Sequence, residues 1–417
     1  MKIFFVGEEI PCEGYSGSNI TGLALIDQLI AQGNVVTAFV DPPDYEDEKI
    51  GVQQLRMLES RGVETVSLRS ARQAALERGQ SRIGASISDF FPSVAHAPVI
   101  RETLERYVAE RKPDILLPFG IAAITWCAGI PGVPQFGPIC ENIYKVVRAR
   151  WRYNVGGIRR NWASLLLVLK AWRTFRKSAL LLGQLEGSGQ FCKDYLEDFK
   201  KHGAPHCKLY HMPVIDEAGQ RWRQLKDEAQ ESVGDRIILV GATSTFTLMH
   251  LNALLEILPR FARRKREGAE IHLIGDIHIP PELSDILTYP FVKLRGYVDD
   301  FGQELRAAKV LLVPTPVPTG SRSRIIKGLS FGCCVVTTVQ EQETTPGLVD
   351  GETALIADGP DALLASIERA LDDDGLRRRI ESGGRRCYEE RFAPEKSVGE
   401  MATDMEKIVR AYQDNDR

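Results

Sequence analysis

Short apolar runs alternate with longer amphipathic stretches along the whole chain. In the first half, apolar runs at 2–7, 35–40, 64–69 and 114–120 have the length of buried strands. Between the first two lies 18–33, where Leu23, Ile26, Leu29 and Ile30 predict one buried face of a helix. Strands that alternate with helices in this way predict an α/β fold with parallel sheets and crossover helices.

A second series of the same kind begins near Arg236. It contains predicted strands at 236–241, 270–276, 292–298, 309–315 and 333–339, and predicted helices at 247–268, 300–309, 322–332 and 361–392. The polar passage 216–235 separates the two series, and we place the linker near Pro213.

The length of 417 residues agrees with two domains. We expect two Rossmann-like domains that face a cleft, one at 1–212 and one at 213–395. A terminal helix at 396–417 is expected to cross back to the first domain. Its apolar side consists of Met401, Met405, Ile408 and Val409.

Composition excludes several classes of protein. The net charge of -3 argues against general nucleic-acid binding, and 43% hydrophobic residues are typical of a globular protein. The eight cysteines form no CxxC pair, which predicts reduced, buried thiols and no zinc site. The start of the chain, 1–11, is typical of a buried strand and not of a signal peptide, so we expect a cytoplasmic protein.

The loops that follow strands are the candidate binding segments, because α/β proteins bind ligands at the carboxyl ends of their strands. The loop at 8–19 lacks the GxGxxG pattern of a dinucleotide site. Its candidate residues are Gly14, Gly17, Ser18 and Asn19, and the alternative is a turn that only caps a helix. In the loop after 236–240, Gly241 allows close approach, while Thr243 and Ser244 offer hydroxyl donors.

Three cations lie together after the fourth strand of the second series. Arg322, Arg324 and Lys327 fall within six residues, and the stretch 315–338 contains no acidic residue. Guanidinium groups at a strand–turn–helix junction are suited to a phosphate. The alternative is a solvated basic face of a helix.

The order of these segments resembles the retaining "glycosyl transferases group 1" class, whose members have the GT-B fold. The resemblance rests on 239–261, 269–276, 292–315, 320–338 and 347–373, with looser agreement in the first half and at 181–216. It implies transfer of a sugar from a nucleoside-diphosphate sugar to a glycan or lipid-linked acceptor, with retention and with no metal or other cofactor.

The resemblance also implies the donor site. Gly296, Tyr297 and Val298 would line the base pocket. Gly320 and Ser321 would border the phosphates, with Arg322 and Arg324 beside them.

The chain departs from the family pattern at two positions. Many relatives have a glutamate where this chain has Thr319, and a ribose-binding glutamate where it has Lys327. Lysine only donates hydrogen bonds, so that role does not transfer. Many relatives also carry an Arg and a Lys in the stretch that corresponds to 241–250, where this chain has no cation. Arg322, Arg324 and Lys327 are candidates to supply that charge to the phosphates, and the alternative is that donor binding is altered or lost.

His96 is the candidate residue on the acceptor side. Two other functions stay open at this stage. One is a noncatalytic GT-B protein that binds a sugar nucleotide, a glycan or a partner enzyme. The other is a sugar-nucleotide epimerase, disfavoured because the expected acid and base carboxylates are not evident in the loops.

The segment 142–185 contains no acidic residue. Its ten Lys and Arg residues are interleaved with Trp151, Trp162 and Trp172 and with the run 165–169. Cations mixed with Trp and Leu are typical of a helix that lies on an anionic membrane. We expect peripheral attachment to the inner face of the membrane, and the alternative is a basic helix that faces acidic loops.

Overall fold

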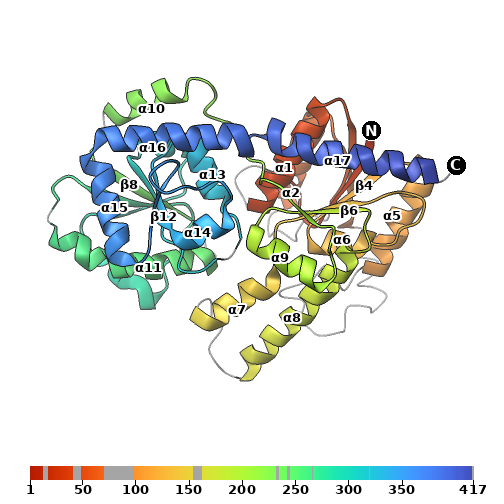
Figure 1. Ribbon diagram of the computed structural model, residues 1–417, viewed down its shortest axis with the longest axis horizontal. Helices are drawn as coiled ribbons and strands as arrows, with labels where there is room; N and C mark the ends of the chain where they lie inside the picture. The colour runs from red at the N-terminus through yellow and green to blue at the C-terminus, as the bar shows by residue number, and fades with distance from the viewer. Residues whose placement is uncertain are drawn as a thin grey trace. The chain divides into compact units, whose positions relative to one another are not determined.

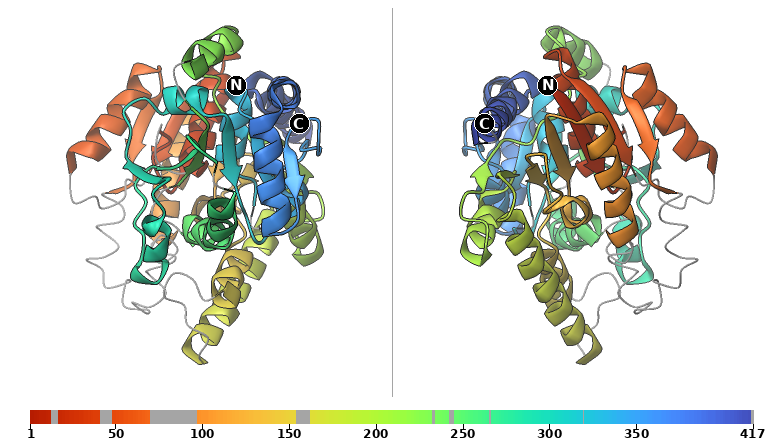
Figure 2. Two further views of the ribbon diagram at one scale, coloured as in Figure 1. Left: turned by 90° about the vertical axis from the view of Figure 1, so that its left-hand side faces the viewer. Right: turned by 90° about the vertical axis from the view of Figure 1, so that its right-hand side faces the viewer.

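The computed structural model describes residues 1–12, 17–40, 48–69, 97–153, 162–231, 234–241, 245–264, 266–318 and 320–415. Figures 1 and 2 show the helices and strands of the chain. Contacts divide the chain into two units. The first contains Met1–Asn142, Trp172–Pro213 and Pro394–Arg417, and the second contains Ile143–Ala171 and Val214–Ala393.

The first unit contains two groups of parallel strands. Four strands pair in the order β3-β2-β1-β4, and three pair in the order β5-β6-β7. A parallel bridge between Leu116 and Gln135 joins the two groups. The strands are β1 (Lys2–Gly7), β2 (Val35–Val40), β3 (Glu64–Ser67), β4 (Ile115–Phe119), β5 (Phe136–Ile139), β6 (Gly187–Gln190) and β7 (Lys208–Leu209).

The helices of the first unit cover these strands with a compact apolar core. Phe4 and Phe39 pack with their ring centroids 4.8 Å apart, and Trp126 is fully buried. The helices are α1 (Gly17–Ala31), α2 (Glu48–Ser60), α5 (Ala97–Arg111), α6 (Ile121–Cys127) and α9 (Lys193–His202). Burial of both faces explains why β1, β2 and β4 are continuous apolar runs.

Helix α17 (Pro394–Asn415) belongs to the first unit although it lies at the far end of the sequence. It packs against α1, and Met401 and Met405 are fully buried. Asp404 accepts hydrogen bonds from Lys208 Nζ and Tyr210 Oη, both at 2.8 Å. Chain segments 196 and 194 residues apart are thereby tied together.

Helices α7 (Ile143–Tyr153) and α8 (Trp162–Leu182) follow β5 in the sequence. The sequence-based division assigned this stretch to the first domain, whereas the contacts group Ile143–Ala171 with the second unit. The second half of α8 packs on α9, where the rings of Phe175 and Phe199 are 5.1 Å apart.

The second unit is built on one parallel sheet of order β10-β9-β8-β11-β12-β13. The strands are β8 (Arg236–Val240), β9 (Glu270–Ile274), β10 (Val292–Gly296), β11 (Val310–Val313), β12 (Val335–Thr338) and β13 (Leu355–Ala357). The helices are α10 (Trp222–Glu231), α11 (Thr245–Arg263), η3 (Pro281–Thr288), α12 (Phe301–Ala307), α13 (Ser323–Ser330), α14 (Val339–Thr344), α15 (Pro360–Asp372), α16 (Asp374–Cys387) and η4 (Tyr388–Phe392).

The single helix expected at 361–392 is wrong, because the chain breaks at Asp373. The backbone of Asp373 is extended, and its carboxylate accepts a hydrogen bond from Leu376 N at 2.8 Å. An aspartate in this position caps the start of a new helix. The result is two helices, α15 and α16, that pack against each other.

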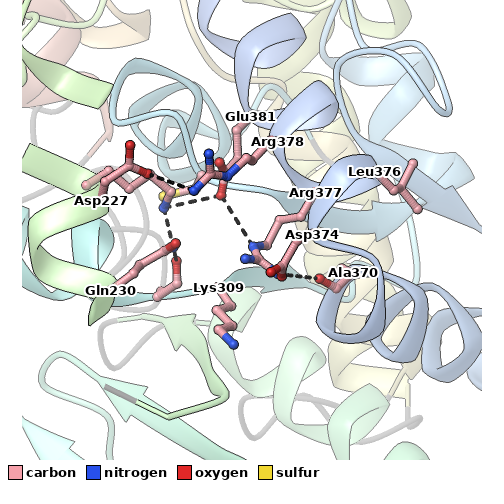
Figure 3. Close-up of polar contacts among 12 residues, drawn as sticks. Asp227, Gln230, Lys309, Ala370, Asp374, Leu376, Arg377, Arg378 and Glu381 are labelled. Carbon is pink, nitrogen blue, oxygen red and sulfur yellow. Dashed lines mark hydrogen bonds and ion pairs between the residues drawn. The ribbon is translucent and has the colours of Figure 1, made fainter. Parts of the chain in front are cut away.

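A buried ionic cluster fixes α10 to the second unit. Glu381 of α16 pairs with Arg223 Nη1 at 2.6 Å and lies 3.8 Å from both Lys226 Nζ and Arg377 Nε. Lys226 is fully buried and donates to Ala308 O at 3.0 Å. Figure 3 shows Arg377 and Glu381 directed toward each other on α16, with Arg378 directed toward Asp227. A buried charge needs such partners, so this cluster fixes the place of α10.

Candidate functional site

The strand order of the second unit identifies one edge of its sheet as the candidate site. The chain runs outward from β8 to β9 and β10, and then returns to place β11 on the other side of β8. In open α/β sheets, ligands bind outside the carboxyl ends of the strands at this reversal. The candidate ligand-binding residues therefore follow β8 and β11.

Glycines end the strands on one side of the reversal. Gly241 N donates to Ile274 O at 2.9 Å, and Gly275 N donates to Gly296 O at 2.8 Å. Gly275 has a φ of 112°, and a Cβ there would lie 1.8 Å from Gly241 O. Only glycine fits at position 275, because the backbone segments that follow β8 and β9 are in direct contact there.

A side-chain hydrogen bond holds the turn before α13. Ser321 Oγ donates to Thr344 O at 2.7 Å, and Gly320 has a φ of 88°. Arg322 occupies the capping position of α13 with an extended backbone. These features direct the two arginines at the start of α13 to different partners.

Arg322 forms a buried ion pair. Its Nε lies 2.9 Å from Glu341 Oε1, with 6% of the arginine side chain and none of the glutamate side chain exposed. Glu341 Oε2 also accepts a hydrogen bond from Thr344 Oγ1 at 3.1 Å. The charge of Arg322 is therefore compensated inside the protein, and the pair ties α13 to α14.

Arg324 points to the carboxyl end of β8. Its Nη1 donates to Val240 O at 2.5 Å and to His250 Nδ1 at 3.1 Å. Because arginine only donates, His250 Nδ1 is the acceptor and the ring proton is on Nε2. His250 Nε2 then donates to Thr315 Oγ1, which lies 3.0 Å away in the segment after β11.

The environment of Arg324 is unfavourable to its charge. Burial and the neighbouring charge of Arg322 lower the pKa of Arg324 to about 10, with Glu341 acting in the opposite direction. Burial, followed by the charges of Arg324 and Arg322, holds the pKa of His250 well below its usual value. At neutral pH the histidine is uncharged and Arg324 remains a cation.

No carboxylate of the described residues lies within ion-pair distance of Arg324. Its Nε and Nη2 likewise have no hydrogen-bond partner within the described part of the chain. A largely enclosed guanidinium that lacks a counter-ion, at the reversal of the strand order, is suited to bind an anion.

Lys327 has different surroundings from the two arginines. Its ammonium pairs with Glu217 and lies 5.6 Å from the ring centroid of Phe331. The adjacent Asp216 accepts two hydrogen bonds from Arg385, at 2.9 and 2.6 Å. Lys327 thus pairs with the segment before α10. It lies one helical turn after Arg324 on α13, but its ammonium has a carboxylate partner, which Arg324 lacks among the described residues.

The remaining candidates that the structure describes fall into two groups. Gly296, Tyr297 and Val298 lie at the end of β10, where Gly296 has a φ of 67° and Tyr297 is 79% exposed. Gly17, Ser18 and Asn19 form the start of α1, and Asn19 Nδ2 donates to Ile10 O at 2.8 Å. Gly14, His96, Thr243, Ser244 and Thr319 lie outside the described residues.

Carboxylates occupy the corresponding edge of the first unit. Glu8 and Glu9 follow β1, and Glu141 follows β5. Glu141 keeps contact with solvent, yet the protein around it desolvates the carboxylate. This desolvation and the charges of Glu8 and Glu9 raise the pKa of Glu141 to about 7. Desolvation also raises the pKa of Glu9, although a hydrogen bond with Asn19 opposes it.

Sequence reasoning missed His250, Thr315, Glu341 and Glu141. One of them had a signal: His250 shares the buried face of α11 with Leu254 and Ile257, at helical spacing. A histidine on an apolar face needs polar partners. For the others, only the folded chain shows the contact.

The described residues show neither a metal-binding cluster nor a membrane-spanning helix. They contain no group of three or more His, Cys, Asp or Glu side chains arranged to hold a metal ion. Among the described helices, none has the length and apolar character needed to cross a membrane.

Comparison with known proteins identifies relatives of the fold. The "Glycosyl transferases group 1" family model matches residues 234–373. A comparison with curated proteins finds no match. Many solved structures, the following three among them, are similar over nearly the whole length of both chains.

The first is HepE from Anabaena in complex with UDP and glucose, with a TM-score of 0.65 at 14% identity, covering 97% of this chain and 99% of that chain. Sucrose-phosphate synthase from Thermosynechococcus elongatus has a TM-score of 0.68 at 15% identity, covering 99% and 100%. WaaG, a glycosyltransferase involved in lipopolysaccharide biosynthesis, has a TM-score of 0.62 at 12% identity, covering 97% and 99%.

Similarity at identities this low establishes a shared fold. It does not show that the proteins share substrates. The predicted α/β architecture with two Rossmann-like domains is confirmed. The chain has the GT-B fold of these glycosyltransferases, and its residues 234–373 match the glycosyl transferases group 1 family.

Proposed function

We propose that the protein is a glycosyltransferase that moves a sugar from a nucleoside-diphosphate sugar to a glycan or lipid-linked acceptor, with retention of configuration. The observation that carries the proposal is the surroundings of Arg324. This cation lies at the strand reversal of a GT-B donor-type domain and has no carboxylate partner among the described residues.

A diphosphate would bind to Nε and Nη2 of Arg324, the nitrogens that have no hydrogen-bond partner among the described residues. Val240 O and His250 Nδ1 hold Nη1 in place, so Nε and Nη2 present a fixed pair of donors to phosphate oxygens. As the bond between sugar and phosphate breaks, negative charge grows on the leaving diphosphate. A guanidinium fixed beforehand stabilises that charge without reorganising. The amide groups at the start of α13, after Gly320 and Ser321, would add to the same effect.

The roles within the cationic segment follow from the contacts. We assign phosphate binding to Arg324, while Arg322 and Lys327 act through the structure, because Glu341 and Glu217 hold their charges. The base is proposed to lie against Gly296, Tyr297 and Val298, and the loop of Gly241, Thr243 and Ser244 to border the phosphates. HepE binds UDP, so uridine nucleotides are the first donors to test.

The acceptor side is proposed to lie at the carboxyl edge of the first unit. The loop that contains Gly14, Gly17, Ser18 and Asn19 follows β1 there, and His96 remains a candidate for contact with the acceptor. The carboxylates of Glu8, Glu9 and Glu141 are suited to hydrogen-bond the hydroxyls of a sugar.

The test of the donor site is calorimetric titration with UDP, UDP-glucose and the corresponding guanosine and adenosine compounds. Loss of a hydrogen bond to a charged group costs about 1.5–3 kcal/mol. Arg324→Ala is therefore expected to weaken binding of the diphosphate roughly ten- to a hundredfold. The thermal stability of the free protein should change little, because loss of the hydrogen bonds to Val240 O and His250 Nδ1 is offset by removal of a charge that burial disfavours.

Arg264→Ala is the matched control. Arg264 pairs with Glu368 at 3.0 Å, and 61% of its side chain is exposed, so its removal should leave nucleotide binding unchanged. Equal affinity of the wild type, Arg324→Ala and Arg264→Ala for every nucleotide tested would refute the donor site.

Turnover decides between transfer and the other two functions. Formation of a glycoside from a bound sugar nucleotide supports the transferase, and binding without turnover supports a noncatalytic protein. The epimerase gains support from Glu141, because a carboxyl whose pKa is about 7 can exchange a proton at neutral pH. Conversion of one free sugar nucleotide to its epimer, lost in Glu141→Gln, would assign that function.

A further inference from the structure

The exposed side of α8 carries both apolar and cationic side chains. Along this helix the exposed positions recur every three or four residues, so they form one stripe. We name it the α8 stripe; its members are Trp162, Leu166, Leu169, Lys170, Arg173, Arg176, Lys177 and Leu180.

The apolar members of the α8 stripe lie in water to an unusual extent. Trp162 is 83% exposed, Leu166 57% and Leu169 49%. They begin the helix, and the four cations follow within the next turns. A surface helix ordinarily turns its leucines toward the core, so this arrangement is typical of an interaction surface.

The charge of the α8 stripe indicates the kind of partner. None of its members is acidic, and neither is any residue from Asn142 to Leu185. A second copy of the chain would therefore offer no carboxylate from this segment to the cations. A lipid surface with anionic headgroups satisfies both parts of the stripe, since Trp and Leu enter the interface while Lys and Arg stay at the headgroups.

We propose that the α8 stripe binds an anionic membrane surface and that the protein is a peripheral membrane protein. The proposal is independent of the donor site, because it rests on α8 alone. It would place the enzyme where a lipid-linked acceptor is found.

Sedimentation with vesicles tests the proposal. The protein should bind vesicles of phosphatidylcholine with one-third phosphatidylglycerol, bind pure phosphatidylcholine vesicles far more weakly, and dissociate as salt is added. Each Lys or Arg near such a surface contributes about fivefold to partitioning. Changing Lys170, Arg173, Arg176 and Lys177 to Gln should therefore weaken binding about a hundredfold or more.

Matched variants test whether vesicle binding depends on the α8 stripe itself or only on net charge and exposed leucines. Arg378, Arg379, Lys396 and Arg410 are exposed on other helices, and changing all four to Gln removes the same charge. Leu166→Ser with Leu169→Ser should weaken vesicle binding about tenfold. Leu287 and Leu294, both 47% exposed, provide the control pair for the same change to Ser.

Several results would overturn the proposal. These are absence of sedimentation with either vesicle, equal binding to neutral and anionic vesicles, or equal losses in the control variants. Binding to RNA or duplex DNA without binding to vesicles would assign a nucleic-acid surface instead. A dimer that dissociates in the Leu166 and Leu169 variant would assign a second copy. Circular dichroism identifies a variant that has failed to fold, and nucleotide binding measured without vesicles reports on the donor site separately.

Discussion

The four-stranded sheet of the first unit and the six-stranded sheet of the second have the same strand order at their centres, and the two units carry opposite charge at the carboxyl edges of their strands. In the first unit the order is β3-β2-β1-β4, and in the second it is β10-β9-β8-β11. Glu8, Glu9 and Glu141 follow strands of the first, whereas Arg322 and Arg324 follow β11 in the second. Strand order therefore determines where a ligand can bind, and the side chains after the strands decide its charge.

The two edges also differ in how the charge is held. In the second unit, one arginine is neutralised by Glu341 and the other is positioned by an uncharged histidine. In the first unit, desolvation and then the charges of Glu8 and Glu9 raise the pKa of Glu141, so this carboxylate takes up a proton more readily. The cationic edge is organised for a fixed charge and the acidic edge for a charge that varies with pH.

The largest effect is expected from breaking the Arg322–Glu341 pair. Glu341→Gln removes the carboxylate that pairs with the buried guanidinium of Arg322, and breaking a buried ion pair costs about 3–5 kcal/mol. We expect a large decrease in the midpoint of thermal unfolding, measured by calorimetry.

The double variant Arg322→Met with Glu341→Leu should recover most of that stability, because no charge remains buried. Its nucleotide affinity should stay close to that of the wild type if Arg324 alone contacts the phosphate. A tenfold loss of affinity in a stable double variant would instead assign Arg322 to the donor site.

A smaller effect is expected at the acidic edge. The pKa of Glu141 is raised from 4.5 to about 7, so the folded state binds more protons than the unfolded state between these values. Stability should fall as the pH rises through this window, by on the order of 1 kcal/mol because the side chain keeps contact with solvent.

Calorimetry of the wild type and of Glu141→Gln across the same pH window checks this expectation. The variant should lose the decrease, since its amide does not titrate. Identical pH profiles of the two proteins would show that Glu141 has an ordinary pKa, and the contrast between the two edges would then be one of sign alone.

The smallest effect is expected at Lys327. Lys327→Gln removes its pairing with Glu217 and should cost about 0.5 kcal/mol, with nucleotide affinity unchanged. Lys327→Glu should cost more through repulsion and also leave the affinity unchanged. Weaker nucleotide binding in both variants would mean that Lys327 contacts the phosphates. Stronger binding of the glutamate variant would mean that the carboxylate serves the ribose.

The sequence predicted the central strands because burial on both faces makes them continuous apolar runs. It did not predict β5, β6 or β7, which are short and include Gly137, Pro138, Gly187 and Gly189. Such residues are rare in strands, and here the pairing with neighbouring strands overrides that preference. The break at Asp373 did have a signal in the sequence, because Asp372, Asp373, Asp374 and Gly375 interrupt the apolar pattern between Leu371 and Leu376.

The sequence named the residues of the candidate site but not the contacts that they make in the fold. Arg322, Arg324 and Lys327 are neighbours in sequence, but Arg322 caps α13, whereas Arg324 and Lys327 lie one turn apart within it. Their partners Glu341, His250 and Glu217 are 19, 74 and 110 residues away. No local pattern encodes such distances, so only the fold separates the arginine that has no carboxylate partner among the described residues from the two cations that have one.

The position of α17 has a consequence for the order in which the protein forms during synthesis. Most of the first unit is translated first, but Asp404 is translated 196 residues after Lys208 and 194 residues after Tyr210, the two residues that bond to it. All of Val214–Ala393 emerges from the ribosome earlier than α17 does. The second unit therefore has its full sequence available while the first still lacks the helix that covers Met401 and Met405. Until α17 arrives, the apolar surface of α1 that it covers is open to chaperones and to aggregation.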